Sequence, residues 1–298
     1  MEQLHDDIKA NRPNIADSSL KTYLSIISNL YKKVNNCQIL DNANIKKFFI
    51  DNVKEVLKFL KNVEPKKRKT TLASLVILTL DKEKPSKIYR EQMIEDNDHV
   101  RQNHTDEKTE KQKENWVDWN EVLEIHRQLG KEVAPLMEKP QRSTTEFNKC
   151  QDYVLLSLYV FQDPRRSEDY TNMYIRDYDK KDSNVNYIDK GHFVFQKYKT
   201  STKDGTQRIP ISTKMKALLK KWLSINDTPY LLVSPTTRKP ITPPILTKRL
   251  NGIFDKKISS SMLRHIFWSN KVDIEELRKT ASNMGHGLNT ALNEYAKQ

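Results

Sequence analysis

A polar stretch near the middle of the chain constrains the fold most. From Asp96 to Asn115 only Val100 is aliphatic, and charged side chains are dense. Such a segment cannot bury enough apolar surface to form a core, and 298 residues are enough for two domains. We therefore predict a first domain over residues 1–95, a polar linker over 96–115 and a second domain over 116–298.

Helical periodicity dominates the first domain. Apolar residues recur with a 3.6-residue spacing in SSLKTYLSIISNLYKKV, which begins at Ser18, and in NVKEVLKFLKNV, which begins at Asn52. Ser18 or Ser19 is the expected N-cap of the first of these helices. The first domain is therefore expected to be a helical bundle.

A basic run precedes the next apolar helix of this domain. Pro65 is followed by Lys66, Lys67, Arg68 and Lys69. Cations at the start of a helix oppose its dipole, and a nearby phosphate backbone would relieve that repulsion. We predict that these four residues bind DNA; the alternative is a solvated charged loop.

The second domain mixes helices and strands. QDYVLLSLYVFQ has the composition of a buried helix, and NVNYID and HFVFQKY predict strands on either side of Lys190–Gly191. Asp204–Gly205 is a hairpin-turn signal before a third strand, QRIPIS. Four further helices are predicted, at 213–224, 242–254, 261–270 and 274–284, and Gly285 is placed to end the last one. The predicted fold class is mainly α with a small antiparallel β-sheet.

The charge of the chain favours an anionic partner. Lysine and arginine number 52 against 39 aspartates and glutamates, a net charge of +13. An excess of this size indicates nucleic acid first and a membrane surface second. The alternative is a lysine-rich surface that is merely solvated.

Several classes of protein are disfavoured by what the sequence lacks. Cys37 and Cys150 form neither a CxxC motif nor a Cys/His cluster, which argues against a disulfide scaffold or a zinc finger. No apolar run is long enough for a transmembrane helix, and the first residues lack a signal-peptide core. No phosphate-binding glycine motif is present. We expect a soluble intracellular protein without metal or cofactor.

Four segments of the second domain carry reactive side chains. They are DPRRSEDY (163–170), YKTSTKDG (198–205), SSMLRHIFW (260–268) and GHGLNTALNEY (285–295). Each is common by itself, but the four in this order resemble the tyrosine recombinases of the phage-integrase family. The segment PRRSEDY is similar to one in integrase-like proteins of large DNA viruses and their satellites. This resemblance implies a location in the nucleus or at a viral replication site.

The resemblance gives five residues a role. Arg165 occupies the family's R-x-S-E-like slot, and Arg264 occupies the arginine slot of an H-x-L-R-H-like segment. Lys199 fits the lysine of the family's β-hairpin, and His286 follows a glycine as the family's histidine does. Tyr295 lies nine residues after His286, at the position of the nucleophile. The resemblance also implies a helical core-binding domain followed by a mixed α/β catalytic domain.

These residue types suit attack on a phosphodiester. Two guanidiniums can brace the non-bridging oxygens of the doubly charged transition state, where a metal would otherwise be needed. A tyrosine hydroxyl has a pKa near ~10 and must lose its proton as it attacks, which nearby cations favour. A lysine can protonate the leaving 5′-oxygen. The family implies a 3′-phosphotyrosyl link that conserves bond energy, so neither metal nor ATP is expected.

Two of the assignments have direct alternatives within the same segments. Arg165 could pair with Glu168 alone, three residues further on. Lys197 or Lys203 could be the acid in place of Lys199. The periodicity of the sequence does not choose between them.

The other three residues have structural alternatives. Arg264 could form a structural ion pair, and His286 could cap a turn. Tyr295 could anchor an amphipathic last helix, since it shares a helical stripe with apolar residues before it.

The sequence departs from the family pattern at two places. Ser261 stands three residues before Arg264, where the family has a histidine, so the proton of the phenol would leave through His265, His286 or water. Ser261 is also the expected N-cap of its helix. In addition, 296–298 are too few to form the helix that many relatives dock on a neighbouring subunit. Either the chain is truncated or subunits couple elsewhere.

The resemblance implies a site-specific DNA recombinase or integrase. Its partners would be double-stranded DNA sites, with four protomers on two sites and a monomer or weak oligomer without DNA. A type IB topoisomerase-like nicking-closing enzyme is one alternative. A DNA-binding relic of the same fold, inert because the histidine is missing, is another.

Overall fold

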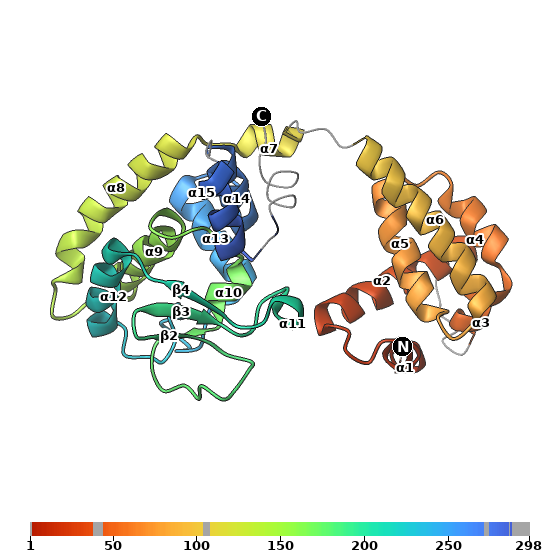
Figure 1. Ribbon diagram of the computed structural model, residues 1–298, viewed down its shortest axis with the longest axis horizontal. Helices are drawn as coiled ribbons and strands as arrows, with labels where there is room; N and C mark the ends of the chain where they lie inside the picture. Colours follow the sequence, from red (N-terminus) through yellow and green to blue (C-terminus); the bar gives the residue numbers. More distant parts are fainter. Residues whose placement is uncertain (1, 38–43, 104–107, 271–273, 286, 288–298) are drawn as a thin grey trace. The chain divides into compact units, whose positions relative to one another are not determined.

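The computed structural model describes residues 2–37, 44–103, 108–270, 274–285 and 287, with only the backbone at 274–278. The chain packs as two compact units, Met1–Thr105 and Asp106–Gln298. In the described residues, helices predominate and the strands form one four-stranded sheet, in the second unit (Figure 1). The predicted fold class, mainly α with a small β-sheet, is confirmed.

The first unit is a bundle of helices. They are α1 (Glu2–Asn11), α2 (Asp17–Val34), α3 (Ile45–Asp51), α4 (Val53–Leu60), α5 (Pro65–Leu78) and α6 (Glu83–Gln102). Helix α5 packs along α6, and buried residues such as Ile27, Phe49 and Leu75 form the core. The buried Tyr89 donates a 2.8 Å hydrogen bond to the carbonyl of Phe49, which ties α6 to α3.

Two details of this unit differ from prediction. Helix α2 begins at Asp17 with Ala16 as its cap residue, so neither Ser18 nor Ser19 is the N-cap. Most of the stretch predicted as a linker is helical: α6 continues to Gln102, and α7 (Glu110–Asn115) follows. The polar half of α6 is held by a pairing that composition does not reveal, since Asp96 is buried against Arg68.

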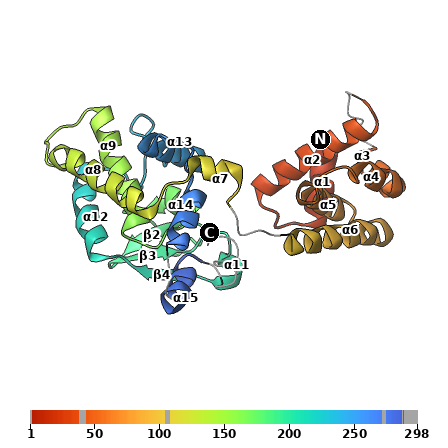
Figure 2. The same cartoon turned by 90° about the horizontal axis from the view of Figure 1, so that it is seen from above.

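The second unit surrounds its sheet with helices. After α7 come α8 (Trp119–Met137), α9 (Thr144–Val160), α10 (Ser167–Thr171), β1 (Met173–Tyr174), β2 (Asn186–Asp189), β3 (His192–Phe195), α11 (Ser201–Asp204), β4 (Gln207–Pro210), α12 (Thr213–Ile225), α13 (Pro243–Phe254), α14 (Ser260–Ser269) and α15 (Ile274–Asn283). Figure 2 shows the same elements from above. None of the helices among the described residues is long and apolar enough to cross a membrane.

The sheet has the order β1-β2-β3-β4 and is mixed rather than purely antiparallel. Strand β1 runs parallel to β2, while β2–β3 and β3–β4 are antiparallel. Lys190 and Gly191 both have positive φ, the backbone that a tight two-residue hairpin needs. The hairpin turn predicted at Asp204–Gly205 is instead the end of α11, because the β3–β4 connection folds into a helical turn that Gly205, at φ 68°, terminates.

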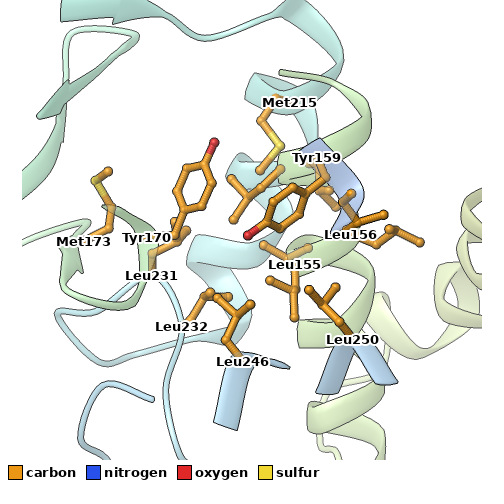
Figure 3. Close-up of a cluster of buried hydrophobic side chains, with 14 of the residues drawn as sticks. Leu155, Leu156, Tyr159, Tyr170, Met173, Met215, Leu231, Leu232, Leu246 and Leu250 are labelled. Atoms are coloured by element: carbon orange, nitrogen blue, oxygen red, sulfur yellow. The ribbon is translucent and has the colours of Figure 1, made fainter. Parts of the chain in front are cut away.

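The core of this unit is built around α9. Its Leu155, Leu156 and Tyr159 are fully buried, and Tyr170, which follows on α10, lies in the same cluster (Figure 3). The rings of Tyr159 and Tyr170 meet edge to face with centroids 5.9 Å apart. Because α10 is anchored in this way, Arg165, two residues before the start of this helix, is held against Phe195 of β3.

Candidate active site

Arg165 lies in the loop between α9 and α10, and its side chain is almost completely buried. Only 1% of the residue is exposed. Its guanidinium carbon lies 3.9 Å from the ring centroid of Phe195 on β3 and 5.2 Å from that of Tyr198, just beyond β3. Two aromatic faces therefore hold the cation in a desolvated position.

Hydrogen bonds of Arg165 join three further segments. Its Nε donates to Oδ2 of Asp169 on α10 at 2.7 Å, and its Nη1 donates to Oε1 of Gln207 on β4 at 2.8 Å. Nη1 also donates to the carbonyl of Asn283 at the end of α15. Asn283 in turn donates from its side chain to Asp163 at 2.8 Å. The first predicted segment and the helix that leads into the fourth thus meet at Arg165.

The remaining nitrogen of Arg165 is the chemically informative one. Nη2 is buried and has no hydrogen-bond partner among the described residues. A Cβ placed on Gly285 would lie 3.6 Å from it. Gly285 has φ 74° and ends α15 by donating to the carbonyl of Ser282 at 3.0 Å, which confirms its predicted role as the residue after the cap. Gly285, one residue before His286 in the sequence, therefore lies beside a guanidinium donor that no described residue occupies.

Asp169 is a site residue that the sequence motifs did not reveal. It is buried and pairs with Arg165, whereas Glu168, the partner considered in the sequence, is exposed. Burial raises the pKa of Asp169, and the cationic Arg165, Arg166 and Arg264 act in the opposite direction. The i, i+4 spacing from Arg165 to Asp169 was the available signal.

Arg264 lies in the middle of α14 and is also buried, with 3% of the residue exposed. Its charge acts on Asp169 and on the hydroxyl of Tyr159. The structure therefore brings the third predicted segment to the same buried carboxylate as the first. Arg165 forms an ion pair with this carboxylate, and the charges of Arg166 and Arg264 also act on it.

Lys199 lies on the β3–β4 connection, and the residues on either side of it are anchored. Tyr198 is buried and its hydroxyl donates to the carbonyl of Gly205 at 2.8 Å. The ring of Tyr198 would lie 3.6 Å from a Cβ placed on Gly285. Thr200 donates to the carbonyl of Gly285 at 3.5 Å. The second segment therefore borders the fourth.

The choice of lysine on this connection stays open. Lys197, Lys199 and Lys203 all lie between β3 and β4, within a stretch of seven residues. Their place in the fold does not single out one side chain, so the assignment of Lys199 as the acid stays a prediction.

The start of α14 corrects one expectation. Its N-cap is Ser259, whose hydroxyl accepts a 3.2 Å hydrogen bond from the backbone nitrogen of Met262. Ser261, the predicted N-cap, is instead an exposed residue of the first turn. His265 is half-buried one residue after Arg264. No capping role thus accounts for Ser261.

Two of the predicted catalytic residues, His286 and Tyr295, lie outside the described residues. The same holds for the apolar residues between 288 and 292 with which Tyr295 would share a helical stripe.

The basic run of the first unit lies within the first turns of α5 and is largely engaged by the protein. Lys67 lies 3.7 Å from Glu64, and Lys69 donates to the side chain of Asn97 at 3.2 Å. Arg68 is bound by Asp96 and by backbone carbonyls. Phosphate binding by these residues stays a prediction, and Arg68 is the one whose donors are most fully used.

Neither a metal-binding group among the described residues nor a known relative was found that would identify the site. Within the described ranges, no three His, Cys, Asp or Glu side chains are grouped so as to hold a metal ion. Compared with known protein families and with curated proteins, the chain matches none of them.

Proposed function

We propose that the chain is a DNA strand transferase of the tyrosine-recombinase kind, a site-specific recombinase or integrase. The observation that carries the proposal is the buried guanidinium of Arg165. Its Nη2, beside Gly285, has no partner in the part of the chain that the structure describes, and its own partner Asp169 also feels the charge of Arg264. The residues around this guanidinium come from segments that are far apart in the sequence.

The unpaired donor fits an anionic substrate. A buried donor without an acceptor costs about 1–3 kcal/mol, and such groups in a native protein call for an explanation. A phosphate oxygen would accept from Nη2 of Arg165. Asp169 and Gln207 would hold the guanidinium so that it needs no reorganisation when charge develops on the phosphorus.

The remaining steps are assigned by the sequence. Tyr295 would attack the phosphorus and release the 5′-oxygen, leaving a 3′-phosphotyrosyl link. Lys199, on the anchored β3–β4 connection, would protonate that oxygen. The phenolic proton would leave through His265, His286 or water, since the hydroxyl of Ser261 accepts no proton near neutral pH.

The partners follow from the same proposal. The substrate is double-stranded DNA, and recombination would use four protomers on two sites, with a monomer or weak oligomer in the absence of DNA. We propose that the protein acts inside the cell, where its DNA substrate is found.

A covalent-capture experiment tests the proposal. Duplexes taken from the DNA flanking the coding sequence, each with a nick beside the candidate cleavage site, should trap the wild-type protein as an adduct on a denaturing gel. Excess EDTA should leave the adduct unchanged. Tyr295→Phe should bind the same duplex and form no adduct.

Tyr198→Phe is the matched control because Tyr198 is a described tyrosine that lies against Arg165. It should still form the adduct. An adduct that survives in Tyr295→Phe would remove Tyr295 from the mechanism. A wild-type adduct without resolution of a synthetic four-way junction would point to a nicking-closing enzyme, and binding without any adduct would point to an inert relic.

A further inference from the structure

A hollow on the first unit is bordered by α4 and α6. Its volume is about 470 Å³, and it is lined by Lys54, Leu57, Lys58, Lys61, Arg68 and Gln92. Four of these six residues are cationic. In the sequence, the lysines of α4 are spaced out along an amphipathic helix and form no basic run.

The three lysines of this hollow share one side of α4 and its end. Lys54, Lys58 and Lys61 follow each other at spacings of four and three residues. None of them forms an ion pair with another described residue, in contrast to Lys46 and Lys67. Like charges at this spacing weaken a helix by roughly 0.2–0.5 kcal/mol per pair. The apolar side of α4 anchors the helix despite this repulsion.

Arg68 forms part of the wall and fixes the end of α4. Its Nη1 donates to the carbonyls of Leu60 and Lys61, at 3.4 and 3.0 Å, and its Nε and Nη2 bind Asp96. The charge of Arg68 is therefore matched by Asp96. Its role is to hold the lysine-bearing helix in place rather than to contact a ligand.

The acidic groups near the hollow do not neutralise the lysines. Asp96 is committed to Arg68, and Glu95 acts on Arg68 and accepts from Gln92 at 3.0 Å. Neither of these two carboxylates forms an ion pair with Lys54, Lys58 or Lys61 in the described part of the first unit. The surface is complementary to a partner that offers several negative charges in a row.

We propose that this hollow binds the phosphate backbone of duplex DNA through Lys54, Lys58 and Lys61. The choice of DNA rests on the proposed function. Seven residues of helix span about 10 Å, which matches roughly three phosphates of one strand at about 3.4 Å of axis each. The main phosphate contact of the first unit is therefore α4, not the basic run at the start of α5.

Salt dependence of binding measures the contacts directly. The full chain is titrated onto a fluorescein-labelled DNA duplex at several salt concentrations, and fluorescence anisotropy gives the affinity. Because each phosphate contact contributes about 0.9 to the slope of log affinity against log salt, the triple variant Lys54→Gln/Lys58→Gln/Lys61→Gln should lower that slope by about 3. Each single variant should lower it by about 1.

A triple variant with the same change in net charge is the control. Lys21, Lys33 and Lys47 lie on α2 and α3 and do not line the hollow. Changing all three to glutamine should lower the slope of log affinity against log salt by less than about 0.9, the contribution of a single phosphate contact. An equal fall in both triple variants would overturn the proposal, because the number of charges rather than their position would then govern binding.

The capture experiment and the salt titration together distinguish a wrong DNA-binding surface from a wrong enzyme assignment. An adduct in the capture experiment together with an unchanged slope in the α4 variant would overturn the hollow and leave the enzyme intact. A lowered slope without any adduct would support the hollow and count against the enzyme. If polyglutamate binds as tightly as the duplex and loses as much affinity in the α4 variant, the partner is an acidic protein and the DNA assignment is overturned.

Discussion

Two arginines, one in each unit, pair with a buried aspartate and differ in what remains unbound. All three nitrogens of Arg68 donate, to Asp96 and to the carbonyls of α4's last turn and the residue after it. Arg165 donates to Asp169 through Nε alone and keeps a buried Nη2 without a partner among the described residues. A saturated arginine is a structural clamp, whereas one with a spare donor in a desolvated position can receive an anion.

The comparison also separates charge from function. Arg68 lies in the basic segment PKKRK, whereas Arg165 lies in DPRRSEDY, whose three acidic residues outnumber its two arginines. Phosphate binding was predicted for the first segment from its charge and for the second from the family resemblance. The hydrogen bonds that Arg68 donates to Asp96 raise the pKa of Arg68 still further, so its charge is permanent but its donors are used. What distinguishes Arg165 from Arg68 is a guanidinium nitrogen without a described acceptor, not the density of positive charge around it.

The largest expected effect is on stability, and it should be common to both arginines. Asp169→Asn leaves the buried guanidinium of Arg165 without its counter-charge, which costs about 3–5 kcal/mol. Asp96→Asn removes the counter-charge of Arg68, which is only half-buried, so this variant should lose less. Urea unfolding followed by tryptophan fluorescence reports the second unit alone, because Trp116, Trp119 and Trp222, like the fourth tryptophan, all lie there. Circular dichroism reports both units.

Glu168→Gln is the matched control for Asp169→Asn. Glu168 is exposed and neighbours Asp169 in the sequence, so its loss should leave the fluorescence transition where it is. If Glu168→Gln unfolds as readily as Asp169→Asn, Arg165 depends on Glu168 and its pairing with Asp169 is not what holds it.

The next effect distinguishes the two arginines by chemistry. Arg165→Lys keeps the charge but loses the planar fork, so single-turnover cleavage of the nicked duplex should fall by roughly 10²–10³-fold. Arg68→Lys should leave the cleavage rate at saturating DNA unchanged, although it loosens the first unit. Equal losses in both variants would mean that the spare donor of Arg165 has no special part in the reaction.

A pH effect of similar size should be confined to the second unit. Its His126 is buried, with Nε2 2.8 Å from the hydroxyl of Ser157, and burial lowers its pKa from 6.5 to about 4. The unfolded state therefore binds the proton first as pH falls. The contribution of His126 is fully present above pH 6.5 and is lost as pH falls through 4, amounting to about 3 kcal/mol.

This pH effect has to be measured as a difference. Burial raises the pKa of Asp152 to about 6, which makes a contribution of opposite sign over nearly the same range, lost as pH rises. Wild type minus His126→Gln, followed by tryptophan fluorescence in urea at about pH 4 and about pH 7, isolates the histidine. A difference that does not change between these two pH values would show that His126 is not buried in its neutral form.

The sequence predicted well those features that depend on residues within one helix. It missed features that depend on contacts between helices. The helical periodicity located α2, α4 and α13 to within a few residues, because each apolar stripe lies within one element. The polar half of α6 was missed because its support comes from Arg68, 28 residues earlier. Composition describes a segment by itself and cannot show a partner on another helix.

The candidate site shows the same limit. Arg165 and Arg264 stand out in the sequence, and the structure places both around Asp169. The spare donor of Arg165 could not be foreseen, since it depends on which groups from β4 and α15 use the other nitrogens. Motifs indicate which residues matter, and packing decides which of their atoms are left to react.

The smallest expected effect concerns the run of three serines before Arg264. Ser259 caps α14, so Ser259→Ala should destabilise the second unit by about 1 kcal/mol. Ser261 is exposed in the first turn, and Ser261→Ala should change stability by no more than about 0.5 kcal/mol. Its hydroxyl cannot accept the phenolic proton near neutral pH, so the single-turnover cleavage rate should also change little, whereas Arg264→Ala should abolish cleavage. General-base catalysis contributes roughly 10²–10⁴-fold, and a loss of that size in Ser261→Ala would show that the serine takes part in the chemistry.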